Sequence, residues 1–401
     1  MAAYIDLGER RSGDRTERRS GDRTEWRLVI APERGQDIYR QIWRWRGAAM
    51  GCDGVFMRQR RLKAPASYPV AHYHCMSRVV NRDFVFGPQE REQFVRLLRG
   101  YERFCGVRVL TYCILSNHFH LLVEVPARPE QPLSDDEVLA RIEALSGSAL
   151  TPRRFRQRLE QFRTAGDAAG ERVFLDRICA TMWDISGYLQ RLKQRFTQWF
   201  NRRKGRRGVL WEERFKSVLV EGAGDPLSTM AAYIDLNPVR AGLVDDPKDY
   251  RWCGYGAAAA GDITARNALA SVIAMAQRRP EVAQDRREAL ATYRMWLFGQ
   301  GEEREGTAPD GGSNRRGFSR EAVLAVLATR GKVSLPEYLQ LRVRYFADGA
   351  VLGTREYVDG VFHALRNRWG PNRTDGARAM QGLAAGAELC VLRDLRKQVF
   401  G

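Results

Sequence analysis

Apolar residues follow two different periods between about residues 68 and 236, and the change of period predicts alternating strands and helices. The segment 88–104 begins at a proline and then places Phe94, Leu97, Leu98 and Phe104 at the spacing of one helix face. Segments rich in β-branched and aromatic residues alternate instead with period two, as half-buried strands do. The predicted strands are 71–79, 107–114, 118–125 and 213–220, and the predicted helices are 88–104, 183–203 and 226–236.

The order of these elements is strand–helix–strand–strand–helix–strand, which is the split βαβ arrangement of ferredoxin-like folds. We therefore predict an α+β fold with a ferredoxin-like or RRM-like antiparallel sheet and helices on one face. A mainly helical C-terminal region is expected to follow it. Polar helical segments at 128–178, broken by glycine and proline, are predicted to be an insertion between the third strand and the second helix.

The first 56 residues are expected to be a disordered or wrongly assigned N-terminal extension. The octapeptide RRSGDRTE occurs twice in tandem, at 10–17 and 18–25, and MAAYIDL at 1–7 reappears at 230–236. Such a polar repeat has no apolar face to bury. We interpret it as duplicated DNA, with the natural start near Met57.

The remaining chain divides by composition into a main domain at 57–255, a helical segment with a polar linker at 256–316, and a helical C-terminal domain at 317–401. Within the last region, 319–329, 335–341 and 354–366 have helical patterns. A DNA-binding helix-turn-helix and a plain packing bundle both fit these three segments.

The net charge adds information about partners. The chain has 66 basic and 48 acidic residues, which gives a formal net charge of +18. Such an excess suggests a polyanionic partner, and release of counterions from phosphates favours nucleic acid. A ribosome- or membrane-associated basic protein, or an arginine-rich proteome, would show the same excess. Seven scattered cysteines without a C-x-x-C pair indicate a reducing, cytoplasmic setting. No apolar run is long enough to predict a membrane span.

The densest basic stretch is 188–220, where ten basic side chains are opposed only by Glu212 and Glu213. Aromatic side chains interleaved with backbone-following cations are typical of single-strand binding. The alternative is a solvated loop in which Phe196 and Phe200 belong to the core. The candidate DNA-binding residues are Trp199, Arg202, Arg203, Lys204, Arg206, Arg207, Arg214 and Lys216, with Arg78 and Arg82 near the first strand as weaker candidates.

Four of the five histidines fall in the predicted sheet as two pairs, His118 with His120 and His72 with His74. Side chains alternate along a strand, so His118 and His120 project from one face and could bind one metal ion. A satisfied polar role is the alternative for either pair, and a four-histidine zinc site is a further one.

Tyr233 and Asn237 lie one helical turn apart in the last predicted helix. A tyrosine hydroxyl is a weak nucleophile at neutral pH unless a cation or base assists it. Pro238 disfavours helical angles at the preceding residue, which places Asn237 at a helix end. Taken alone, Tyr233 is better explained as an amphipathic core residue than as a nucleophile.

Four ordered motifs together resemble the single-tyrosine HUH transposases, and within them the REP-associated tyrosine transposases. These motifs are HYHCMSRVVNR at 72–82, YCILSNHFHLLVEVP at 112–126, QRFTQWFNRRKGRRGVLWEERFKSVLVE at 194–221 and YIDLNPVRAGLV at 233–244. They cover roughly 57–255, which the resemblance identifies as the catalytic domain.

The resemblance implies a role for each motif position. His118 and His120 would bind Mg²⁺ or Mn²⁺, Asn237 would be the third ligand, and Tyr233 would be the nucleophile. Tyr188 and Tyr101 do not occupy the motif position. The expected reaction is metal-dependent nicking and strand transfer of single-stranded DNA at hairpin (palindromic, REP-like) elements through a 5′-phosphotyrosine. His72 and His74 receive no role beyond support of the sheet.

Other functions remain open at this point. A domesticated protein could bind such hairpins without cutting them, and a transcription regulator could act through 319–366. A replication initiator or relaxase would share the chemistry, but commonly adds a helicase or a second tyrosine. The expected partner is DNA, with no membrane, and the protein is expected to be a monomer or a homodimer.

Overall fold

The computed structural model describes residues 61–145, 150–298, 339, 344–380 and 389–393. The predicted N-terminal extension, the linker at 299–316 and the helix at 319–329 lie outside these residues, as does 335–341 except for Leu339. The described residues belong to one compact unit that begins at Arg60.

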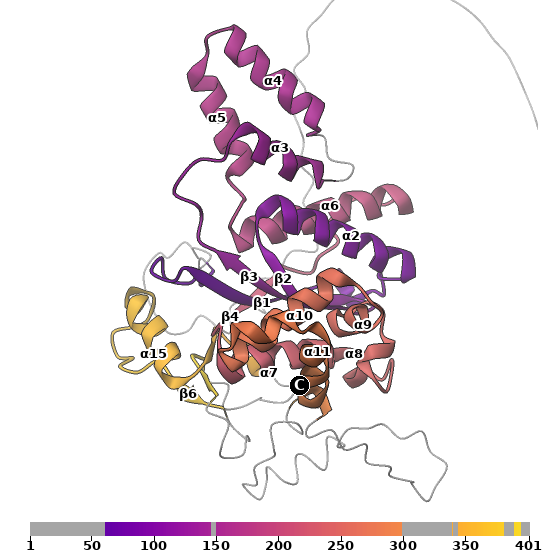
Figure 1. Ribbon diagram of the computed structural model, residues 1–401, viewed down its shortest axis with the longest axis vertical. Helices are drawn as coiled ribbons and strands as arrows, with labels where there is room; N and C mark the ends of the chain where they lie inside the picture. Colours follow the sequence, from indigo (N-terminus) through magenta and orange to yellow (C-terminus); the bar gives the residue numbers. More distant parts are fainter. Residues whose placement is uncertain (1–60, 146–149, 299–338, 340–343, 381–388, 394–401) are drawn as a thin grey trace, which may run out of the picture. The chain divides into compact units, whose positions relative to one another are not determined.

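A four-stranded antiparallel sheet forms the centre of the fold, in the order β2-β3-β1-β4 (Figure 1). Two helices, one in each βαβ half, complete the split βαβ arrangement. The predicted ferredoxin-like α+β fold is confirmed. The elements are β1 (Val70–Arg78), α2 (Pro88–Cys105), β2 (Arg108–Ile114), β3 (His118–Pro126), α6 (Ile185–Lys204) and β4 (Lys216–Val220).

Local sequence explains where α2 begins and ends. Pro88 occupies the first helical turn, where its missing N–H has no intrahelical partner to lose. The helix ends at Gly106, whose φ of 65° is a left-handed conformation that glycine adopts without a Cβ clash. Phe94 and Phe104 on its apolar face are fully buried, and α2 packs against α6 on one side of the sheet.

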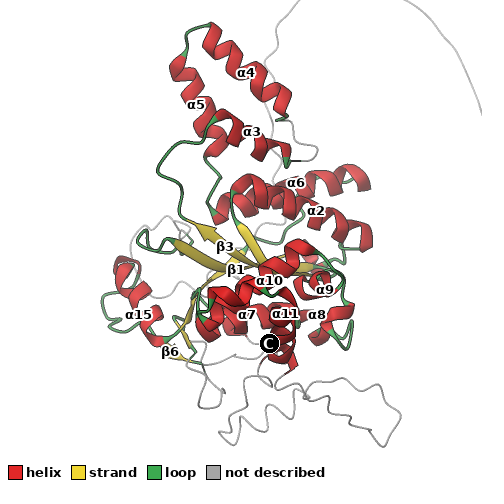
Figure 2. Ribbon diagram, viewed as in Figure 1, coloured by secondary structure: helices red, strands yellow, loops and turns green. Residues whose placement is uncertain are grey.

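Helices also cover the second face of the sheet, which the sequence had not predicted (Figure 2). The signal was present in β2 and β4, where consecutive apolar residues are buried on both sides instead of alternating with polar ones. Leu110, Leu122 and Val218 face this second layer. Its helices are α7 (Gly224–Asp235), α8 (Asn237–Arg240), α9 (Gly254–Ala259), α10 (Ile263–Gln277), α11 (Arg286–Phe298) and α14 (Arg344–Asp348).

The C-terminal region extends the sheet, although its pattern had predicted mainly helices. β5 (Val351–Gly353) pairs in parallel with β4, and β7 (Cys390–Val391) and β6 (Arg378–Ala379) follow it to give seven strands. Strands of two or three residues are too short to show a periodic pattern. α15 (Arg355–Ala364) lies within the predicted helical segment 354–366.

The predicted insertion is a group of three helices with polar caps. Ser134, Thr151 and Asp167 each accept a hydrogen bond from a backbone N–H in the first turn of the helix that follows. These helices are α3 (Asp135–Glu143), α4 (Pro152–Thr164) and α5 (Ala168–Cys179). Short 3₁₀ helices lie at Val80–Arg82, Pro247–Asp249, Pro280–Gln284 and Arg366–Arg368. None of the helices described here is both long and apolar enough to cross a membrane.

Candidate active site

The His-Phe-His segment begins β3 and divides its side chains between the two faces of the sheet. Phe119 is fully buried and packs against Phe94 and Trp211, with ring centroids 4.8 and 5.5 Å away. His118 and His120 project from the opposite face with ring centroids 5.2 Å apart. The alternation predicted from the strand period therefore places both imidazoles side by side.

Tyr233, from α7, lies against His120 and His74, an arrangement that the spacing in the sequence alone could not predict. Its ring centroid is 6.2 Å from that of His120 and 6.1 Å from that of His74, in both cases nearly edge-on. The predicted nucleophile and one predicted metal ligand, 113 residues apart in the chain, thus meet on the second face of the sheet.

The two rival tyrosines lie elsewhere. Tyr188 is fully buried in α6, and its hydroxyl lies 3.4 Å from the carbonyl oxygen of Leu98 in α2. Tyr101 is also buried in α2 and contacts Phe104. Both belong to the helical layer on the face of Phe119, so the sheet separates them from His120.

His72 has a structural role at the other end of β1. Its Nε2 lies 3.3 Å from the carboxylate of Glu124, which also accepts two hydrogen bonds from Arg108. Burial opposes ionisation of Glu124, but these bonds lower its pKa to about 2. A Cβ on Gly222 would lie 2.4 Å from the His72 ring, so that position admits only glycine without rearrangement.

His74 connects the candidate site to the C-terminal region. Its Nδ1 lies 2.6 Å from the carbonyl oxygen of Phe346, and its Nε2 lies 2.9 Å from Nδ1 of His120. Complete burial lowers the pKa of His74 to about 4, despite the hydrogen bond to the carbonyl. The residues described contain no cluster of three or more His, Cys, Asp or Glu side chains able to hold a metal. The four-histidine zinc site is therefore not supported.

Asn237 is the first residue of α8, at the break after α7 that Pro238 predicted. Its Nδ2 donates to the carbonyl oxygens of Tyr233 and Ile234, at 3.1 and 3.0 Å. Since both contacts are to acceptors, the amide nitrogen must face them, and Oδ1 is the atom that could coordinate a cation.

Arg240 and Phe346 also contact Tyr233, and the sequence analysis assigned neither of them a role. The Arg240 guanidinium lies 4.2 Å from the centre of the Tyr233 ring and donates to the carbonyl oxygen of Leu339 at 2.6 Å. The Phe346 ring lies 4.5 Å from that of Tyr233. Arg240 could have been found, because it lies seven residues after Tyr233 within the same motif. Nothing in the sequence pointed to Phe346.

A pocket of about 250 Å³ opens at the end of β1 beside His118. Arg78 is the strand partner of His118 in the antiparallel register. The segment after Leu210 runs back along this edge, since the N–H of Glu212 donates to the carbonyl of Arg78 at 3.0 Å. The pocket is lined by Met76, Ser77, Arg78, Arg82, Glu212, Glu213, Arg214 and Lys216. Four of the predicted DNA-binding residues are thus brought together at the end of β1, where Arg78 pairs with His118.

The other predicted DNA-binding residues lie at the end of α6, outside this pocket. Arg202, Arg203, Lys204 and Arg207 are exposed, and Arg206 is half-buried. Lys204 pairs with Glu90 at 3.2 Å, and Trp199 packs half-buried against the core. Phe196 and Phe200 are buried, as the alternative interpretation of this stretch predicted.

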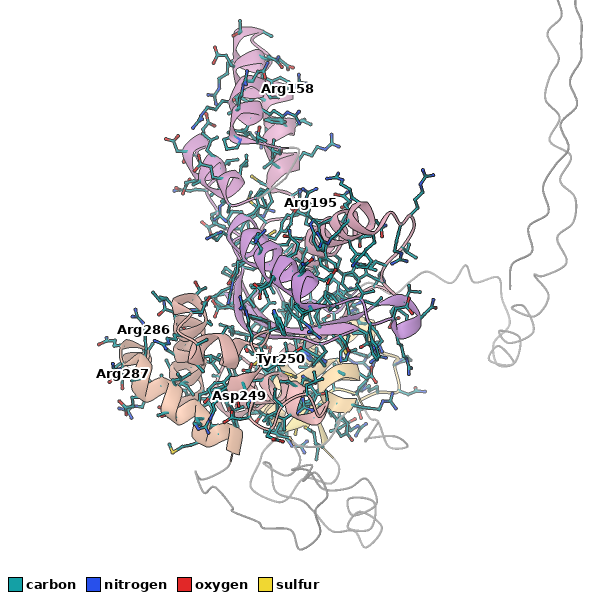
Figure 3. All side chains as sticks on the ribbon, turned by 90° about the vertical axis from the view of Figure 1, so that its right-hand side faces the viewer. Arg158, Arg195, Asp249, Tyr250, Arg286 and Arg287 are labelled. Carbon is teal, nitrogen blue, oxygen red and sulfur yellow. The ribbon has the colours of Figure 1, made fainter. Side chains whose placement is uncertain are left out.

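Basic side chains are also spread over other helices of the molecule (Figure 3). Arg158 on α4 and Arg286 and Arg287 at the start of α11 are exposed, and Arg195 is half-buried on α6. Net charge therefore indicates a class of partner and does not locate the binding surface.

One comparison with known proteins, a family model, agrees with the motifs. Residues 67–143 match the family model described as IS200-like transposase. A solved structure of a REP-associated tyrosine transposase bound to a REP hairpin is 13% identical, with a TM-score of 0.32, over 51% of this chain and 87% of the other. The curated proteins give no significant match. Over residues 67–143 the chain is thus similar to the IS200-like transposases, in agreement with the resemblance that the motifs carry.

Proposed function

We propose that this protein nicks single-stranded DNA at hairpin-forming, REP-like elements and transfers the cut strand through Tyr233. The observation that supports it most directly is the meeting of Tyr233, from a late helix, with His120 on a distant strand, at a ring-centroid distance of 6.2 Å. A pure binding protein needs no such arrangement, whereas a phosphotyrosine enzyme does.

The proposal includes a divalent ion, Mg²⁺ or Mn²⁺, and it rests on the chemistry of three donors rather than on a cluster of His, Cys, Asp or Glu side chains. His118 and His120 would supply imidazole nitrogens, and Asn237 an amide oxygen, a donor set that suits Mn²⁺ at least as well as Mg²⁺. When bound, the ion would neutralise charge on a non-bridging oxygen of the scissile phosphate.

Tyr233 would attack the phosphorus with its phenolic oxygen. A P–O bond to tyrosine forms while the bond to the 3′ oxygen breaks, leaving a 5′-phosphotyrosine and a 3′-hydroxyl. The proton lost by the phenol balances the one gained by the 3′ oxygen. Since one phosphodiester replaces another, a 3′-hydroxyl can reverse the step and join strands without ATP.

DNA would lie along the basic pocket beside His118. Arg78, Arg82, Arg214 and Lys216 could hold phosphates there while the scissile bond lies over the histidine pair. The exposed cations of 202–207 would extend this contact along the strand.

Access to the tyrosine requires a movement. Tyr233 and His120 are each only 3% exposed, and Phe346 covers the tyrosine ring. A nucleotide can therefore reach Tyr233 only when the segment that carries Phe346 moves aside.

The decisive experiment is incubation of the protein with an end-labelled hairpin-bearing single strand and Mn²⁺, followed by a denaturing gel. A covalent adduct is expected with the wild type and with Tyr188→Phe, which removes a hydroxyl from the opposite layer. Tyr233→Phe should form none, and His118→Ala should retain most DNA affinity while losing metal-dependent cleavage. An adduct formed by Tyr233→Phe would refute the assignment.

Tight hairpin binding without any adduct would favour the alternative, a protein that binds hairpins without cutting them. The burial of Tyr233 beneath Phe346 agrees with that alternative. The cytoplasmic location and the choice between monomer and homodimer stay predictions. A duplex of the same sequence is the control for strand preference.

A further inference from the structure

We propose that His74 and Asn117 are positioning residues that hold His118 and His120 in the same tautomer, with the proton on Nδ1 and the lone pair on Nε2. This inference rests on the proposed function, since it assigns the atoms with which the pair would bind a metal ion. Neither residue would touch the substrate.

The first hydrogen-bond chain begins at the carbonyl oxygen of Phe346, which can only accept. Nδ1 of His74, 2.6 Å away, must therefore carry a proton. A neutral imidazole has one N–H, so Nε2 of His74 is an acceptor, and Nδ1 of His120 at 2.9 Å must be its donor. His74 is 1% exposed, and its burial favours the neutral ring that this chain requires.

The second chain begins at another carbonyl, that of Arg82. Nδ2 of Asn117 donates to it at 3.0 Å, which orients the amide. Oδ1 of Asn117 then faces Nδ1 of His118 at 2.7 Å, and because an amide oxygen accepts, Nδ1 of His118 is the donor.

Two separate chains of hydrogen bonds thus place the proton on Nδ1 in both His118 and His120. One runs through the neighbouring strand to the C-terminal region, and the other through the connection between β2 and β3. In each ring the remaining nitrogen, Nε2, carries the lone pair that a metal ion needs. Partners of this kind fix the tautomer and orientation of metal-binding histidines, and their loss typically reduces metal affinity about 10–100-fold.

The test uses the full-length, metal-free protein labelled with ¹⁵N-histidine. Long-range ¹H–¹⁵N correlation spectra distinguish N–H from lone-pair nitrogens, and the chain has only five histidines to assign. Both His118 and His120 are expected to show a protonated Nδ1 and an unprotonated Nε2. A protonated Nε2 on either ring would overturn the proposal.

Matched variants then separate positioning from packing. His74→Phe keeps a ring but removes the acceptor, whereas His74→Gln keeps an oxygen that can accept. We expect His74→Phe to give mixed tautomers at His120 and Mn²⁺ affinity about 10–100-fold weaker, measured by calorimetry. His74→Gln should restore both. Unchanged tautomer and affinity in a folded His74→Phe protein would overturn the proposal.

Asn117 provides a second pair, because it is only half-buried and its variants are more certain to fold. Asn117→Asp retains the acceptor and should leave His118 protonated at Nδ1, whereas Asn117→Ala should not. Failure of the proposed function can be distinguished from failure of the tautomer assignment. In that case the wild type would show the expected tautomers, but it would bind no Mn²⁺ and form no DNA adduct. That result would leave the tautomer assignment supported.

Discussion

Asp235 provides the sharpest test of how the tyrosine helix is held. It lies two residues after Tyr233 in α7 and has no exposed surface. Its carboxylate accepts hydrogen bonds from the hydroxyls of Thr111 at 2.9 Å and Tyr293 at 2.6 Å, and from the N–H of Tyr255 at 3.0 Å. One side chain thus links α7 to β2, α9 and α11.

Burial raises the pKa of Asp235 from 3.8 to about 6, although the hydrogen bonds oppose this shift. At a pH between these two values, the Asp235 carboxyl is ionised in the unfolded chain but still protonated in the folded protein. Stability associated with this group is therefore complete below pH 3.8 and is lost as pH rises to about 6. At about 1.4 kcal/mol per pKa unit, the loss amounts to about 3 kcal/mol.

Asp235→Asn should remove this pH dependence, because the amide cannot ionise. Its oxygen can accept from Tyr255, and its nitrogen can donate to the Tyr293 hydroxyl, which can rotate to accept. Asp235→Ala is the contrasting variant, since it leaves three buried donors without an acceptor, at about 1–3 kcal/mol each.

The measurement is urea unfolding followed by tryptophan fluorescence from pH 4 to 7.5. Between pH 4 and 6, the wild type should lose about 3 kcal/mol relative to Asp235→Asn, after which the difference stays constant. Because other carboxyl groups titrate in both proteins, only the difference between the two curves is interpreted. Parallel curves over this range would refute the reasoning.

Three further predictions follow from the same structure. Glu124→Gln should lower the free energy of unfolding at pH 7 by about 2–3 kcal/mol, an amount that the wild type loses only as pH falls from 4.5 toward 2. Unfolding at pH 7 and at pH 2.5 measures this difference. Equal stability of the two proteins at pH 7 would contradict the prediction. Arg78→Ala should weaken single-strand binding and reduce the salt slope by about 0.7–1, while Arg158→Ala on α4 should leave both unchanged. Phe346→Ala should destabilise the fold by roughly 3–5 kcal/mol. It should nevertheless speed formation of the DNA adduct, because it uncovers the Tyr233 ring. A slower reaction in the folded variant would contradict the view that Phe346 blocks access to Tyr233.

Much of the central fold could be predicted because its elements are long enough to show a period. α2 and α6 carry complete apolar faces, and β3 places His118 and His120 on one side by simple alternation. Pro238 likewise marked the break before α8. These are local properties, determined by backbone geometry and side-chain direction within a few residues.

The second helical layer and the added strands were not predictable in the same way. β5, β6 and β7 contain two or three residues each, so their pairing depends on partners far along the chain. Period alone could not show that the sheet is buried on both faces, although the continuous apolar runs of β2 and β4 indicated it.

The sequence by itself determined the ferredoxin-like core, the common face of the two histidines and the class of partner that the positive charge favours. Only the tertiary structure decided that Tyr233 meets His120, that His74 reaches the carbonyl of Phe346, and that Asn117 orients His118. The physical reason is range: hydrophobic periodicity encodes contacts within one element, whereas a hydrogen-bond direction or a ring contact depends on how distant segments pack.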